Sequence, residues 1–146
     1  MSTLAQNPIR TAKAGVTYFA LVFGAGFVLG SIRVPFLVPR LGERMAELIE
    51  MPLMFVVVLF SARFIIRRFA LPTATSVRLC AGLLAVSLLL TAEFLLAVAL
   101  PGQSLGEYIA SRDRVSGSVY LAMLLLFSVM PFILARAQLA REPHVA

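Results

Sequence analysis

The stretch GAGFVLGSIRVPFLVPRLGERMAELIEM (Gly24–Met51) contains the end of one apolar segment, two prolines and a charged segment that leads into the next apolar run. The residue that precedes a proline is disfavoured in helical geometry. Pro35 and Pro39 therefore predict a turn over Val34–Leu41. We expect this turn to lie at a membrane surface and to join two transmembrane helices.

The composition of the whole chain is that of an integral membrane protein. Of its 146 residues, 60% are hydrophobic and 14% are charged, whereas a soluble domain has about 25% charged residues. Its long apolar runs predict an all-α bundle of four transmembrane helices. The predicted spans are 14–34, 47–66, 79–100 and 119–135, and we expect them to form a single membrane domain over residues 1–146.

The net charge of +6 comes from basic residues that flank the apolar runs. This placement indicates contact with membrane lipids rather than with nucleic acid. Eight lysines and arginines lie on the side of the two termini: Arg10, Lys13, Arg63, Arg67, Arg68, Arg78, Arg136 and Arg141. Five lie on the other side: Arg33, Arg40, Arg44, Arg112 and Arg114. The excess favours cytoplasmic termini, and we call the opposite side the outer side.

Glu50 belongs to the second predicted span. The uncharged run Met51–Ala62 has only twelve residues, which is about 18 Å of helix. A bilayer core needs about 20 residues. The span must therefore include Glu50, Arg63 or both, and an arginine near a helix end can extend to the surface more easily than a glutamate.

Three charges, Arg33, Glu50 and Glu93, are expected in one layer toward the outer side. An isolated charge at the centre of a bilayer costs about 2.5–3.5 kcal/mol on insertion scales, so such groups face the bundle and pair. We predict that Arg33 pairs with Glu93, with Glu50 or with both. One acid then lacks a counter-charge, and burial favours its neutral form. Such an acid would permit a proton-linked function, whereas the simpler alternative is that the three charges fix helix packing.

A charged helical segment precedes the second span. Arg40, Glu43, Arg44 and Glu47 are spaced so that Arg40–Glu43 and Arg44–Glu47 lie within reach on one helix. Each such pair would contribute about 0.2–0.5 kcal/mol. The spacing predicts a solvated helix start on the outer side.

Two further patterns concern packing and the last loop. Gly26-x-x-x-Gly30 places two small residues on one helix face, which allows close helix packing within the chain or, alternatively, between two copies. Ser104-x-x-Glu107 matches a capping box, and Tyr108 lies on the apolar face that follows. This second pattern predicts a short interfacial helix between the third and fourth spans.

No pattern indicates a cofactor or a metal. Cys80 and His144 are single residues, which does not support a Cys/His site. Phosphate loops, nucleophile motifs and dinucleotide fingerprints are also absent from the sequence.

The runs GSIRVPFLVPRLGERMAELIEMP (30–52), TAEF (91–94) and GEYIASRDRVSG (106–117) resemble those of a family of small bacterial membrane proteins with four helices. The resemblance implies the bacterial inner membrane and gives no information about activity. Small multidrug exporters differ because their glutamate lies in the first helix, where this chain has no acid. Fluoride channels carry asparagine in the second helix, whereas the single asparagine here is Asn7.

The leading hypothesis is a non-enzymatic accessory or assembly protein that binds lipid or a partner, which could be a second copy or another membrane protein. The alternative is a proton- or ion-coupled transporter or channel that uses Glu93 and Glu50 with Arg33 as counter-charge. A third option is a lipid-modifying enzyme that uses the outer carboxylates. A cavity that reaches Glu93 would favour transport, and a dry, paired Glu93 would favour a packing role.

Overall fold

The computed structural model describes residues 7–99 and 113–141, and these residues form helices without strands. The elements are α1 (Pro8–Ile32), the π-helix η1 (Arg33–Leu37), α2 (Val38–Leu41), α3 (Glu43–Arg68), α4 (Thr75–Ala99) and α6 (Arg114–Arg141). Four helical segments are long and apolar enough to cross a membrane: 8–41, 43–68, 75–99 and 114–141. The predicted interfacial helix with Ser104, Glu107 and Tyr108 lies outside the described residues.

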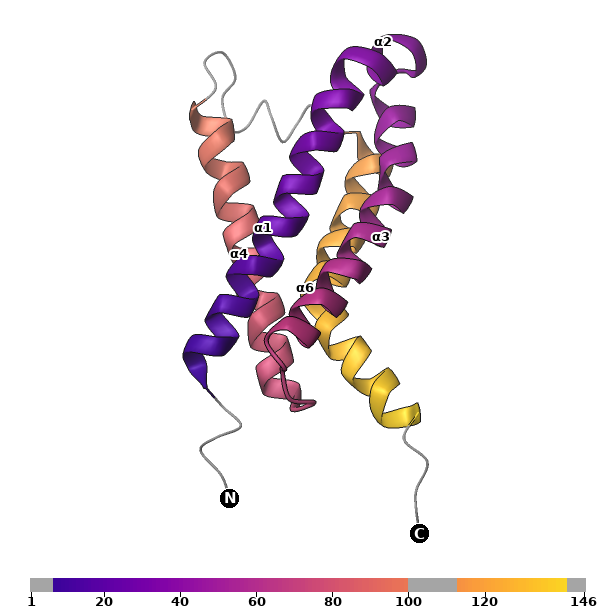
Figure 1. Cartoon of the computed structure of the whole chain (residues 1–146). Helices are drawn as coiled ribbons and strands as arrows, with labels where there is room; N and C mark the ends of the chain where they lie inside the picture. Colours follow the sequence, from indigo (N-terminus) through magenta and orange to yellow (C-terminus); the bar gives the residue numbers. More distant parts are fainter. Residues whose placement is uncertain (1–6, 100–112, 142–146) are drawn as a thin grey trace.

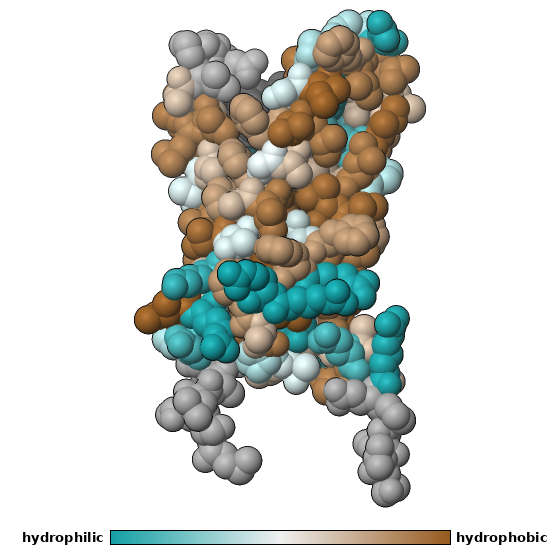
Figure 2. Space-filling model, in the orientation of Figure 1, coloured by the Kyte–Doolittle hydropathy of each residue, from teal (hydrophilic) through white to brown (hydrophobic). Residues whose placement is uncertain are grey.

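The four long helices form a bundle in which α1 and α6 each pack against both α3 and α4 (Figure 1). The start of α1 and the end of α6 lie at the same end of the bundle, which we call the near end. The opposite end, where α2 joins α3, is the far end. Apolar residues cover most of the visible surface, and hydrophilic residues form a band at the near end (Figure 2). This surface is that of a multi-pass membrane protein.

The predicted turn over Val34–Leu41 is wrong, because the first helix continues to Leu41. Pro35 has no N–H to donate, and the chain adapts by widening the helix into a π turn, in which the amide of Val38 donates to the carbonyl of Arg33. Local π adjustments of this kind allow proline inside membrane helices. The chain then reverses at Gly42, whose φ of 80° favours glycine.

Two helices approach each other closely at Gly82, where α4 meets α6. A Cβ atom at this position would overlap the carbonyl oxygen of Ser128. Gly26 and Gly30 are different: a Cβ at Gly26 would meet only the Met54 side chain at 3.6 Å, and a Cβ at Gly30 would meet nothing within 4 Å. The prediction that Gly26 and Gly30 pack closely within the chain is therefore wrong, because the helices separate at that depth.

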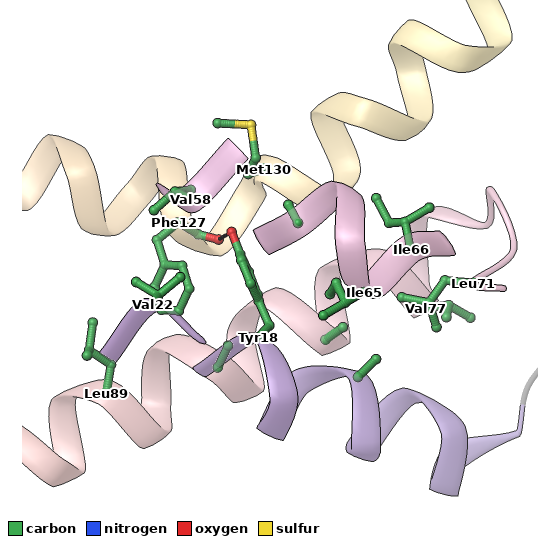
Figure 3. Packing of buried hydrophobic residues seen from close by; sticks show 14 residues of the cluster. Tyr18, Val22, Val58, Ile65, Ile66, Leu71, Val77, Leu89, Phe127 and Met130 are labelled. Atoms are coloured by element: carbon green, nitrogen blue, oxygen red, sulfur yellow. Dashed lines mark hydrogen bonds between the residues drawn. The ribbon is translucent and has the colours of Figure 1, made fainter. Parts of the chain in front are cut away.

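The core of the near half contains a hydrogen bond between α1 and α6. The fully buried Tyr18 hydroxyl donates to the carbonyl of Phe127 at 2.9 Å, and the two rings lie 4.5 Å apart (Figure 3). Pro131, four residues after Phe127, has no N–H and cannot give this carbonyl its helical hydrogen bond. Tyr18 thus satisfies an acceptor that a proline leaves open.

Arg78 is a second polar residue of the core, with 1% of its surface exposed. Its guanidinium donates to the carbonyls of Leu71, Pro72 and Pro131 and to the side chain of Gln138. It therefore joins the α3–α4 connection to α6. The sequence placed Arg78 among the basic residues of a surface loop and did not indicate this burial.

Candidate functional site: a charged cavity at the far end

A cavity of about 1010 Å³ lies between the four helices in the far half of the bundle. Its walls come from the second half of α1 with η1, the first half of α3, the second half of α4 and the first half of α6. Most of its lining is apolar, including Phe23, Phe27, Met54, Leu96 and Phe127. Gly26 and Gly30 also line it, and their missing side chains leave part of its volume open.

Arg33 and two glutamates form the polar wall between η1 and α3. Arg33 Nη1 lies 3.1 Å from Glu50 Oε2 and 3.8 Å from Glu47 Oε1. Glu47 and Glu50 are three residues apart, so they share the face of α3 that is turned toward η1. Their side chains are 18% and 14% exposed, and that of Arg33 is 25% exposed. The structure thus brings Arg33 to Glu50, and it adds Glu47, which we had expected on a solvated helix start.

Two buried atoms of this group make no hydrogen bond within the described residues. They are Arg33 Nε, a donor, and Glu50 Oε2, an acceptor that contacts Arg33 as an ion pair only. Buried polar groups are usually hydrogen-bonded, so a donor and an acceptor left without partners beside the cavity carry a free-energy cost.

Glu93 lies on the α4 side of the same cavity, and Tyr120 of α6 donates a hydrogen bond to its carboxylate. No salt bridge joins Glu93 to a cation among the residues that the structure describes. The predicted pairing of Arg33 is therefore realised with Glu50 and not with Glu93. The sequence analysis missed Tyr120, although a tyrosine inside an apolar span usually has a hydrogen-bond partner when it is buried.

The charged segment before α3 differs from its prediction. Gly42 separates Arg40 in α2 from Glu43 in α3, so the two residues are not on one continuous helix. Both are exposed, and neither forms a salt bridge within residues 7–99 and 113–141. Arg44 does not pair with Glu47 either. The predicted i, i+3 pairs are therefore not formed.

Arg44 instead reaches across to the start of α6. Its Nε donates to Asp113 Oδ2 at 2.9 Å, and its second guanidinium nitrogen donates to the other oxygen. Asp113 also accepts from the amides of Val115 and Ser116 and so caps α6. The Arg44 guanidinium, with the amides, holds the pKa of Asp113 below its usual value. The pair joins the first turns of α3 and α6 at the far end.

The described part of the chain contains no group of three or more His, Cys, Asp and Glu side chains that could hold a metal ion. The fold and the cavity together define a polytopic membrane protein with a partly polar internal cavity. A search of family models, of curated proteins and of solved structures finds no match to the chain. Function is therefore inferred from the site itself.

Proposed function

We propose that this protein is a non-enzymatic membrane protein that binds an amphipathic, lipid-like molecule in its charged cavity. The observation that carries the proposal is the cavity itself, which combines apolar walls with a small group of convergent polar side chains. Ligand sites have this composition, and their usual volume is about 300–1,000 Å³. The cavity of about 1010 Å³ is at the top of that range. Charges that served only to fix helix packing would not require so much unfilled space.

The polar wall suits a ligand head that carries both signs of charge. The Arg33 side chain is 25% exposed and lines the cavity, so its guanidinium can donate to a phosphate oxygen, and guanidinium–phosphate contacts are strong. The carboxylates of Glu47, Glu50 and Glu93 can accept from an ammonium group. A zwitterionic phospholipid head has both groups, and its acyl chains would lie against the apolar walls.

Access for such a ligand is proposed between α1 and α4. These helices meet near Gly15, where an added Cβ would lie 3.1 Å from the carbonyl oxygen of Ala81. They separate toward the far end (Figure 1). Both helices contribute to the lining of the cavity there, and we propose that a lipid enters from the bilayer on this side.

The setting that we propose is the bacterial inner membrane, with both termini in the cytoplasm. The excess of basic residues on the terminal side supports this orientation. The far end with its cavity would then lie in the periplasmic leaflet.

Substitution of Gly30 by Phe tests lipid binding, because this position faces open space in the cavity. The matched control is Gly24→Phe, since Gly24 is also open, lies on the same helix and does not line the cavity. Native mass spectrometry after incubation with phosphatidylethanolamine should show lipid bound to the wild type and to the Gly24 variant, and much less bound to the Gly30 variant. Equal occupancy in the two variants would remove the cavity as the binding site.

Proton- or ion-coupled transport is a second candidate, because the cavity reaches Glu93 and contains three carboxylates against the single guanidinium of Arg33 in its described lining. One carboxylate could therefore bind a proton or a cation. Proteoliposomes with an internal pH-sensitive dye test this candidate, with Glu93→Gln as the variant. Absence of flux in both the wild type and the variant would eliminate it and leave lipid binding unaffected.

A further inference from the structure

A second, smaller cleft lies between α3 and α6 at the near end of the bundle. Its volume is about 100 Å³, and three arginines line it: Arg63 and Arg67 from α3 and Arg141 from α6. Gln138 is the other polar residue of the lining, and apolar residues complete it. Arg63 and Arg67 are one helical turn apart, so they share one face of α3. Three arginines from two helices therefore line a single cleft.

The positive charge of this cleft is not neutralised by any carboxylate in the described ranges 7–99 and 113–141. The salt bridges there involve Arg33 and Arg44, and the cleft lining contains no acid. Glu142, which follows Arg141, lies outside the described residues. All three cleft arginines are exposed, so their charges are available to an anion.

Neighbouring arginines at the same end have other contacts. The guanidinium of Arg68 lies 6.0 Å from the centre of the Phe69 ring, and that of Arg136 lies 5.5 Å from the Phe132 ring. Arg78 is buried and hydrogen-bonded to carbonyls. The cleft arginines thus differ in their contacts from Arg68, Arg78 and Arg136.

The size and position of the cleft indicate which ligand it can bind. A volume of about 100 Å³ corresponds to about three water molecules of liquid, which suits a phosphate group and excludes a whole lipid. Arg63 is the first charged residue after the apolar run of α3. Phe60, three residues earlier on the same face, is 65% exposed. A phosphate in the cleft could therefore belong to a lipid whose acyl chains lie along the exposed apolar surface of α3, beside the hydrophilic band (Figure 2).

We infer that the cleft of Arg63, Arg67 and Arg141 binds the phosphate of an anionic membrane phospholipid. Guanidinium groups bind phosphate through paired, charge-assisted hydrogen bonds. Basic pockets between transmembrane helices are suited to anionic headgroups because no opposite charge inside the protein competes. This site is separate from the charged cavity and does not depend on its ligand.

The test compares two double variants of the full chain in lipid nanodiscs. Arg63→Gln/Arg141→Gln removes one cleft charge from each helix, and Arg68→Gln/Arg136→Gln removes one charge from each helix outside the cleft. Affinity for phosphatidylglycerol relative to phosphatidylcholine is measured by native mass spectrometry. The cleft variant should lose about tenfold or more, and the control should stay within about twofold of the wild type. Circular dichroism checks that both variants fold.

Three results would overturn the inference. An equal loss in both double variants would mean that the whole basic band attracts anionic lipid without a defined site. No loss in either variant would mean that the cleft binds no lipid phosphate. Displacement of the lipid by glycerol phosphate at concentrations equal to that of the lipid would mean that the site serves a soluble phosphate instead.

Discussion

The hydrogen bond from Tyr18 to the Phe127 carbonyl gives the sharpest prediction about the fold. The change Tyr18→Phe removes only the hydroxyl and keeps the ring, which lies 4.5 Å from the ring of Phe127. Because Pro131 has no N–H, the Phe127 carbonyl then loses the donor that compensates for the proline in a fully buried position.

The expected change in the free energy of unfolding follows from this unsatisfied carbonyl. A buried acceptor without a partner costs about 1–3 kcal/mol. Hydrogen bonds between helices in membrane proteins average about 0.6 kcal/mol and reach about 1.7 kcal/mol. We expect Tyr18→Phe to lower the free energy of unfolding by about 1–2 kcal/mol, toward the upper part of the second range, because the proline prevents replacement of the lost donor.

The substitution Pro131→Ala provides a control for the role of the proline. An alanine at position 131 restores an amide that can donate to Phe127, so the hydroxyl of Tyr18 becomes redundant. In that background Tyr18→Phe should cost less than about 0.5 kcal/mol, and the double-mutant cycle should give a coupling of about 1 kcal/mol. Ser87→Ala is a second control, since the Ser87 hydroxyl donates within its own helix to Leu83, and it should be nearly neutral.

Unfolding of the four cycle proteins in bicelles, followed by far-ultraviolet circular dichroism during titration with sodium dodecyl sulfate, measures these free energies. An equal cost of Tyr18→Phe in both backgrounds would contradict this role of the hydroxyl. In that case, the loss would come from packing around the ring and not from the carbonyl that the proline leaves open.

Two other predictions concern the contacts of α6. Gly82→Ala should destabilise the protein by about 2–3 kcal/mol, because the new methyl group overlaps the carbonyl of Ser128, and the same denaturant titration with Gly24→Ala as control should show no such loss. Asp113→Asn keeps the cap of α6 and removes the charge pair with Arg44. Because the folded pKa of Asp113 is depressed, the pair stabilises the protein above about pH 4. The stability difference between the wild type and the variant should disappear as the pH falls below this value. Thermal melts across this pH range measure the difference. A difference that does not change with pH would contradict the role given to the Arg44–Asp113 pair.

The helices were predictable because a membrane span needs length and an apolar sequence, and both can be read directly. The end of the first helix was not predictable, since the rule for residues before proline describes ordinary α-geometry. The π turn from Arg33 moves the reversal to Gly42. The reversal at Gly42 also separates Arg40 from Glu43. The unrecognised π turn therefore accounts for the absence of the predicted Arg40–Glu43 pair.

The sequence indicated some residues of the charged cavity but not their arrangement, and it did not indicate Glu47 or Tyr120. Depth along the helices placed Arg33, Glu50 and Glu93 in one layer, and all three line the charged cavity. The depth of a residue along its helix does not give the rotation of that helix about its own axis, however. This rotation determines that Glu93 contacts Tyr120 and that Arg33 contacts Glu50. The packing of the glycines was predicted incorrectly for a different reason. A glycine permits close packing of two helices but does not require it, so Gly30 borders open space whereas Gly82 contacts α6.

The two halves of the bundle are held together by different forces. In the near half, buried apolar side chains and close backbone contact at Gly82 join the helices. In the far half, where the cavity leaves little apolar contact, polar links join neighbouring helices: Arg33–Glu50 from η1 to α3, Arg44–Asp113 from α3 to the start of α6, and Tyr120–Glu93 from α6 to α4. Among residues 7–99 and 113–141, no such link joins α1 to α4. Close packing in the near half therefore fixes the helices, and three polar links in the far half hold neighbouring helices around a wide cavity.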